Sequence, residues 1–185
     1  ACAAAAGTAA MSQDALPAVV EEMQGDRDMT LARLVLFARP ILAAHDLSAV
    51  ARLAERVPEF SAGGQGAALA QGAALLKVAS DAEKLERLTR LGISGTIDPP
   101  AAAPYVAVLL SDRFRSVRRR AAEALQGSAN GAVIEALAMG CFDEDLLTAV
   151  LAADAPSLKG VPDRALPIWL AGLDSPGHGR ICCAG

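Results

Sequence analysis

The sequence predicts an all-α fold, either an irregular helical bundle or a short array of antiparallel helices. Hydrophobic residues make up 53% of the chain but aromatic residues only 3%, so alanine, the best helix former, supplies much of the apolar content. β-branched and aromatic residues, which strands prefer, are sparse outside short runs. A length of 185 residues suits one domain with one core, in which small side chains let helices approach closely.

Two helices are expected before Pro40. Acidic Asp14 precedes an apolar run that ends at Gly25, and these signals favour a short helix over residues 14–24. The next apolar side chains recur at helical spacing, and Pro40 should end or kink their helix near Arg39, because proline lacks an amide hydrogen. These side chains are Leu31, Leu34, Val35 and Ala38.

Three more helices are expected before the middle of the chain. Asp46 is a good N-cap for a helix that Pro58 stops. Residues 63–78 are rich in glycine and alanine, so their helix would offer a surface that another helix can approach closely. Ser80 and Glu83 form an S-x-x-E capping box, and the helix after it carries Glu–Arg pairs at the stabilising i,i+4 spacing. The pairs are Glu83 with Arg87 and Glu86 with Arg90.

The strongest candidate for an internal linker is the segment 92–104, because its glycine and proline residues interrupt a helix. It joins two helical halves of a single all-α domain, residues 14–173. A low-complexity segment, residues 1–13, precedes this domain, and an irregular tail, residues 174–185, follows it. The helices expected after the linker cover residues 101–111, 115–126, 131–139, 143–152 and 162–173.

Five arginines lie within eight residues of a chain whose net charge is −4 at pH 7. This acidic balance and the scarcity of aromatic rings for base stacking argue against nucleic acid as a partner. On a helix the apolar residues of the stretch form a continuous stripe, and the arginines lie largely off it. We expect a solvated surface that is either inert or docked on another protein subunit of acidic character. Its partner-binding residues would be Arg113, Arg115, Arg119 and Arg120.

The same region carries the one family resemblance in the chain. Within residues 102–137 an expected helix ends in two leucines, Asp112 follows, and Val117 and Arg118 come next in the pattern. This pattern resembles a HEAT or HEAT-like repeat. The resemblance implies a structural role for Asp112 and Arg118, with the arginine bonding across the stack of helices.

The resemblance covers about one repeat. A solenoid needs about three units to bury its hydrophobic faces, and no second copy of the Asp…Val-Arg signature is visible in residues 11–91. The two alternatives are therefore a short HEAT-like array and an irregular bundle that contains one HEAT-like hairpin.

No motif for catalysis, a cofactor or a membrane span stands out. The sequence has no phosphate-binding loop, and its longest apolar stretch, residues 31–44, contains two arginines and a proline, which is incompatible with a spanning helix. His178, Cys182 and Cys183 are weak metal-ligand candidates, because adjacent cysteines do not easily take tetrahedral positions and no CxxC pair exists. We expect no metal and no cofactor.

The most economical function is a non-catalytic helical protein–protein interaction module, as an accessory or scaffolding subunit of a larger assembly. It would present the arginine surface and an acidic surface around residues 143–145. Two alternatives stay open. One is a HEAT-like ligand-handling enzyme of the chromophore-lyase sort, and the other is a metal or redox protein that uses the tail with His178, Cys182 and Cys183.

The first ten residues, ACAAAAGTAA, do not begin with Met. Such a start is typical of a chain that has lost a targeting peptide, or of residues placed ahead of a start at Met11. Under the first interpretation we expect the protein in an organelle or an exported compartment.

Overall fold

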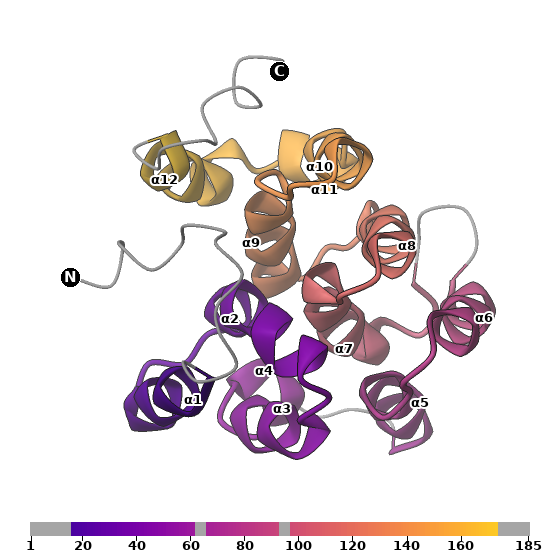
Figure 1. Ribbon diagram of the computed structural model, residues 1–185. Coiled ribbons are helices and arrows are strands. Elements are labelled where there is room, and N and C mark those ends of the chain that lie inside the picture. The colour runs from indigo at the N-terminus through magenta and orange to yellow at the C-terminus, as the bar shows by residue number, and fades with distance from the viewer. Residues whose placement is uncertain (1–15, 62–65, 93–96, 174–185) are drawn as a thin grey trace.

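The computed structural model describes residues 16–61, 66–92 and 97–173. These residues form twelve α-helices and no strand, so the all-α prediction is confirmed (Figure 1). No helix among them is long and apolar enough to cross a membrane. The helices are α1 (Leu16–Gly25), α2 (Leu31–Ala43), α3 (Leu47–Ala54), α4 (Pro58–Ser61), α5 (Gly66–Leu76), α6 (Asp81–Leu91), α7 (Ala103–Val108), α8 (Arg115–Leu125), α9 (Gly131–Gly140), α10 (Leu146–Ala153), α11 (Pro156–Lys159) and α12 (Pro162–Leu173).

Three successive helix pairs, α5–α6, α7–α8 and α9–α10, stack in the same order through the larger part of the molecule. Their first helices form an inner layer in which α5 contacts α7 and α7 contacts α9. Their second helices form an outer layer in which α6 contacts α8 and α8 contacts α10 (Figure 1). The 3₁₀ turns Pro100–Ala102 and Leu109–Ser111 flank the short α7.

The N-terminal helices cover the inner layer. Helix α2 packs against both α7 and α9, and α3 and α4 reach α5 and α7. At the far end α12 packs on α9. The inner face of the stack is therefore filled by helices of the same chain, and the hydrophobic core runs continuously between the two halves.

Helix α9 lies at the centre of this arrangement, in contact with α2, α7, α8, α10 and α12. Its buried side chains point to several sides of the helix, as expected for a helix without a solvated face. Small residues make this crowding possible, since a Cβ added at Gly140 would lie 3.2 Å from the Cβ of Ala152 on α10. The buried residues of α9 are Val133, Ile134, Ala136, Leu137, Ala138 and Gly140.

The local signals read from the sequence are confirmed at several helix ends. Asp46 caps α3 by accepting a hydrogen bond from the amide of Ala49 at 2.9 Å. Ser80 caps α6 by accepting from the amide of Glu83 at 3.4 Å. The two i,i+4 pairs of α6 are also present, with Arg87 2.6 Å from Glu83 and Arg90 2.5 Å from Glu86.

Helix α2 continues through Pro40 to Ala43, so the helix does not end near Arg39, which was one of the two outcomes expected at this proline. The added turn buries Ile41 and Leu42 completely or nearly so, and this burial offsets the backbone hydrogen bond that the proline cannot donate. His45 then follows in the left-handed conformation, with φ of 55°. Its amide donates to Leu42, in the hydrogen-bonding pattern that ends many helices.

Replacing Gly72 in α5 with alanine is expected to destabilise the protein by about 1–3 kcal/mol, as overpacked core sites do. A Cβ at this position would lie 2.7 Å from Tyr105 Cδ2 and 3.2 Å from Ala102 Cα. The same change at Gly66, which has no neighbouring atom of the described residues within 4 Å, should leave stability unchanged or raise it, because alanine favours helix. Urea denaturation of both variants measures the difference, and equal stabilities would contradict the close contact between α5 and α7.

Candidate functional site

The five arginines of the sequence stretch divide into three groups in the structure. Arg118 points inward and is 2% exposed. Arg119 and Arg120 are half-buried and bond to other parts of the chain. Arg113 and Arg115 are exposed at the start of α8.

Arg118 connects the start of α8 to the turn that leads into α10. Its Nε donates to Asp143 Oδ2 at 2.8 Å and its Nη2 donates to Asp143 Oδ1 at 3.0 Å, which is the bidentate geometry of a strong arginine–carboxylate pair. Its Nη1 donates to the backbone carbonyl of Asp112 at 2.9 Å. Arg39 of α2 also donates to Asp143, at 2.9 Å. The buried carboxylate of Asp143 therefore has two cationic partners.

A second buried ion pair lies one helix pair earlier. Lys84 of α6 contacts the carboxylate of Asp112, and Asp112 has no exposed surface. The other oxygen of Asp112 accepts from the amide of Phe114 at 3.0 Å and so fixes the turn before α8. Asp143 repeats this turn, since its Oδ1 accepts from the amide of Asp145 at 2.8 Å.

These two ion pairs occupy matching places in the stack. Lys84 and Arg118 are each the fourth residue of an outer helix. Each cation reaches the aspartate that stands three residues before the next outer helix, Asp112 or Asp143. We call the two pairs the buried ladder. It ties α6 to the turn before α8, and α8 to the turn before α10.

Arg119 and Arg120 are bound within the chain. Arg119 makes a bidentate contact with Asp145, at 2.8 and 2.5 Å, and Asp145 caps α10 by accepting from the amide of Thr148 at 3.0 Å. Arg120 donates to Glu123 at 2.6 Å and to the backbone carbonyl of Gly92 at 2.9 Å. Arg113 also donates to the backbone carbonyl of Ala79, at 3.5 Å, so three of the four arginines expected at a partner surface already hold intramolecular bonds.

Arg113 and Arg115 are the arginines of this stretch with no carboxylate within ion-pair distance among the described residues. The guanidinium of Arg113 lies 4.4 Å from the ring centroid of Phe114, so the ring holds the cation in place. Together with Arg118, Glu144 and Asp145 they border a shallow hollow of about 290 Å³. We call Arg113 and Arg115 the arginine rim.

Lowering the pH is expected to reduce the free energy of unfolding, in part through protonation of Asp145. The hydrogen bonds from Arg119 hold the pKa of the Asp145 carboxyl well below its usual range. A carboxyl whose folded pKa is depressed contributes stability above its unfolded pKa of about 4, and this contribution is lost as pH falls toward the folded pKa. The Asp145→Asn variant should therefore lose less stability than the wild type between about pH 5 and pH 2. Urea denaturation across this range measures the slope, and identical slopes would contradict the role of this pair.

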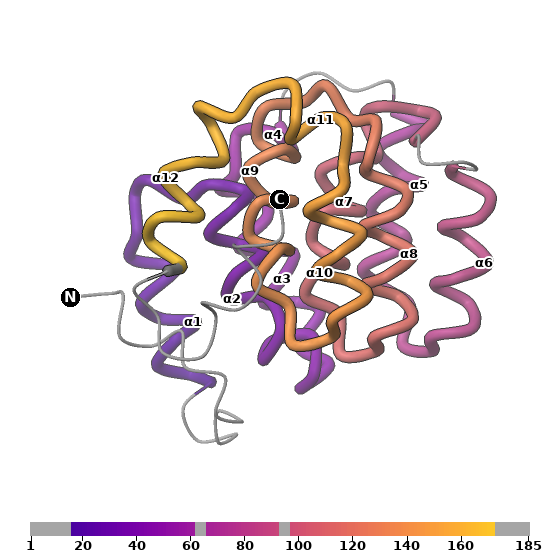
Figure 2. Tube along the Cα trace, turned by 90° about the horizontal axis from the view of Figure 1, so that it is seen from above, coloured from indigo at the N-terminus to yellow at the C-terminus, as the bar shows by residue number. Residues whose placement is uncertain are grey.

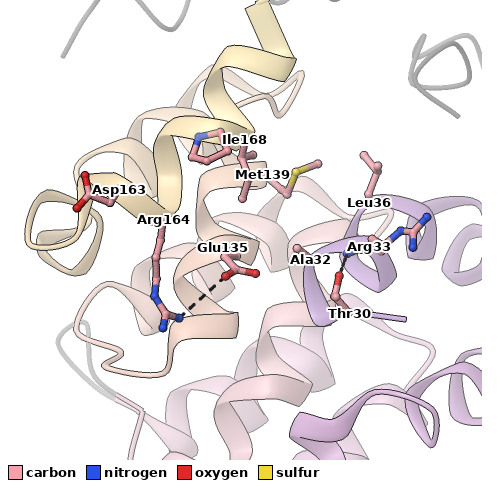
Figure 3. Close-up of a pocket in the computed structure, with 10 residues that line it drawn as sticks. Thr30, Ala32, Arg33, Leu36, Glu135, Met139, Asp163, Arg164 and Ile168 are labelled. Atoms are coloured by element: carbon pink, nitrogen blue, oxygen red, sulfur yellow. Dashed lines mark hydrogen bonds and ion pairs between the residues drawn. The ribbon is translucent and has the colours of Figure 1, made fainter. Parts of the chain in front are cut away.

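A separate open groove of about 450 Å³ lies between α2, α9 and α12 (Figure 3). Leu36, Met139 and Ile168 contribute apolar surface to it. Three of the charged residues that border it are paired, Arg164 with Glu135 at 4.0 Å and Arg33 with Asp26. These paired groups of the groove therefore do not point together at one place where a ligand could bind.

The structure brings no metal-binding cluster together within its described residues, where no group of three or more His, Cys, Asp or Glu side chains could hold an ion. His178, Cys182 and Cys183 lie outside the described residues, so the metal or redox alternative stays a prediction. Cys141 is buried within the described part of the chain. Its thiol donates to the carbonyl of Leu137 at 3.6 Å.

Sequence reasoning missed Lys84, Asp143 and Arg39 as members of the buried ladder and its surroundings. Lys84 was given no role from the sequence, and Asp143 was placed in an acidic surface around residues 143–145. The signal that could have found them is positional. The same spacing occurs twice: an outer helix carries a cation at its fourth residue, and an aspartate stands three residues before the following outer helix.

No protein-family model matches this sequence, and no curated protein or solved structure is significantly similar to the chain.

Proposed function

We propose that the chain is a non-catalytic helical interaction module of the HEAT-like kind, which serves as an accessory subunit in a larger protein assembly. Its arginine rim docks on an acidic segment of a partner protein. The proposal rests on one observation above all. Arg113 and Arg115 are exposed at the start of α8 and have no carboxylate partner among the described residues, where Arg113 donates only to the carbonyl of Ala79, whereas Arg118, Arg119 and Arg120 each pair with a carboxylate of the chain.

The buried ladder supports the HEAT-like assignment. The resemblance implied that Asp112 and Arg118 bond across a stack, and each of them forms an ion pair with a different neighbouring helix pair. Two rungs link three successive helix pairs, which is about the number of units that an independent helical array needs.

The buried ladder also explains why the arginine rim suits docking. Asp112, immediately before the rim, is fixed by Lys84 on one side and by the amide of Phe114 on the other. A rigid site loses little conformational entropy when a partner binds. The exposed guanidinium groups supply charge and planar hydrogen-bond donors, which match carboxylates.

The composition of the rim favours a protein partner over nucleic acid. The two exposed arginines of the rim, on a chain of net charge −4, can neutralise few phosphates, whereas nucleic-acid affinity grows with the number of phosphates neutralised. The nearby ring of Phe114 is already covered by Arg113 and is not presented for base stacking.

The test compares two charge reversals of equal size. The Arg113→Glu/Arg115→Glu variant removes the arginine rim, and Arg27→Glu/Arg52→Glu makes the same charge change at exposed arginines near α1 and on α3. Wild-type protein and both variants are immobilised and exposed to extract from the native source, and the association rate of each bound protein is measured at two salt concentrations. We expect an acidic protein to bind the wild type and the control, and to associate at least tenfold more slowly with the rim variant.

Two outcomes would contradict the proposal. One is a partner that binds the rim variant as fast as the control. The other is a partner whose association rate does not change with salt, because rim charges act mainly on salt-sensitive encounter.

A further inference from the structure

The hollow beside the arginine rim has a cationic side and an anionic side. Arg113 and Arg115 border it from the start of α8, whereas Glu144 and Asp145 border it from the turn before α10. Helices α8 and α10 lie side by side in the outer layer (Figure 2), and the bond from Arg118 to that turn brings the starts of the two helices together. A segment that docks on the arginine rim therefore also meets the residues before α10.

Of the two carboxylates at this hollow, Glu144 is the one presented to solvent. Its side chain is 61% exposed, whereas that of Asp145 is 11% exposed and paired within the chain. Both ion pairs of Glu144 use the same oxygen, Oε1, which lies 3.3 Å from Arg39 and 3.4 Å from Arg118. These two arginines bond more closely to Asp143, at 2.9 and 2.8 Å.

The second oxygen of Glu144 is therefore the acceptor that this side of the hollow offers to a partner. Oε2 forms no hydrogen bond or ion pair with any of the residues that the structure describes. An exposed carboxylate oxygen attracts an ammonium or guanidinium group, and it repels another carboxylate.

A partner segment that carries only negative charges does not fit both sides of the hollow. Its carboxylates would be attracted by Arg113 and Arg115, but one that reached the turn before α10 would meet the like charge of Glu144. Such like-charge contacts at an interface suppress the wrong partners, and docking surfaces gain selectivity by combining attraction for one partner with repulsion of others.

We infer that the docking segment of the partner carries a lysine or arginine among its acidic residues. Its carboxylates contact the arginine rim, and its cation contacts Glu144. This inference rests on the proposed function and names the charge pattern of the segment that the rim takes. Glu144 is then a specificity-determining residue, which selects mixed-charge segments over segments that are acidic alone.

The test removes the charge of Glu144 with little change in size. Wild-type protein, Glu144→Gln and the matched control Glu55→Gln, at an exposed position just after α3, are compared for binding to the partner protein isolated from native extract on the wild type. We expect Glu144→Gln to raise the dissociation constant about threefold or more, as loss of an exposed ion pair does, and Glu55→Gln to leave it unchanged. A partner that is acidic alone would bind Glu144→Gln more tightly, because a repulsive charge has gone.

A conservative variant separates the charge of Glu144 from its packing. Glu144→Asp keeps the carboxylate and should keep most of the affinity. A loss as large as that of Glu144→Gln would assign the effect to the shape of the turn and overturn the inference. Urea denaturation checks that each variant is as stable as the wild type, as expected because Arg118 keeps its closer bond to Asp143.

The Arg113→Glu/Arg115→Glu variant in the same assay distinguishes this inference from the proposed function. If the rim variant binds weakly but Glu144→Gln binds as well as the wild type or better, the arginine rim docks a purely acidic segment and only the present inference is wrong. If the rim variant binds as well as the wild type, or no protein in the extract binds the wild type, both proposals are wrong.

Discussion

Replacing Lys84 with methionine is expected to lower the free energy of unfolding by about 3–5 kcal/mol, the usual cost of breaking a buried ion pair by removing one partner. Asp112 has no exposed surface, and Lys84 is its one cationic partner among the described residues. The variant would leave a buried carboxylate whose charge only the amide of Phe114 stabilises. Urea denaturation at neutral pH measures the loss.

Two further variants separate the ion pair from other effects of this substitution. Lys77→Met, at an exposed position just after α5, should leave stability nearly unchanged. Adding Asp112→Asn to Lys84→Met should recover a large part of the loss, because an uncharged amide needs no counterion and can still accept from Phe114. If Lys84→Met were no more destabilising than Lys77→Met, the ladder would have no energetic role.

The Arg118→Ala variant is expected to lose about 3 kcal/mol, at the lower end of the same range. Asp143 would keep Arg39 as a cationic partner, whereas Asp112 keeps none when Lys84 is removed. The backbone carbonyl of Asp112 would also lose its donor. The same denaturation experiment measures both variants side by side.

Arg115→Ala is the matched control for Arg118→Ala, since Arg115 lies on the same helix and is exposed. We expect it to change stability by less than about 0.5 kcal/mol. Arg119→Ala should fall between the two, because its pair with Asp145 is partly exposed and such pairs contribute up to about 1 kcal/mol. Equal effects from Arg115 and Arg118 would remove the reason for treating residues 112–118 as a structural signature.

The sequence predicted the features of the fold that depend on near neighbours. The Asp46 and Ser80 caps and the Glu83–Arg87 pair involve residues within four positions of each other, so one short window contains the whole interaction. The end of α2 was predicted less well. Local reasoning left open whether Pro40 ends or kinks the helix, and burial of Ile41 by distant helices keeps the chain helical for another turn.

The candidate site depends on distant contacts and was therefore only partly predictable. The sequence singled out Arg118, but its carboxylate partner Asp143 comes from the following helix pair. Arg119 was expected at the outer surface, and it instead binds Asp145 at the start of α10. Helical periodicity separates apolar from polar faces, but it does not show which helices pack against each other.

Hydrogen–deuterium exchange of the protein, alone and within its native assembly, tests the interaction-module proposal most directly. Exchange reports which backbone amides become protected when a partner binds. We predict that the assembly protects residues 112–116, around the arginine rim. Protection confined to the groove between α2, α9 and α12, or no difference between the free protein and the assembly, would contradict the proposal.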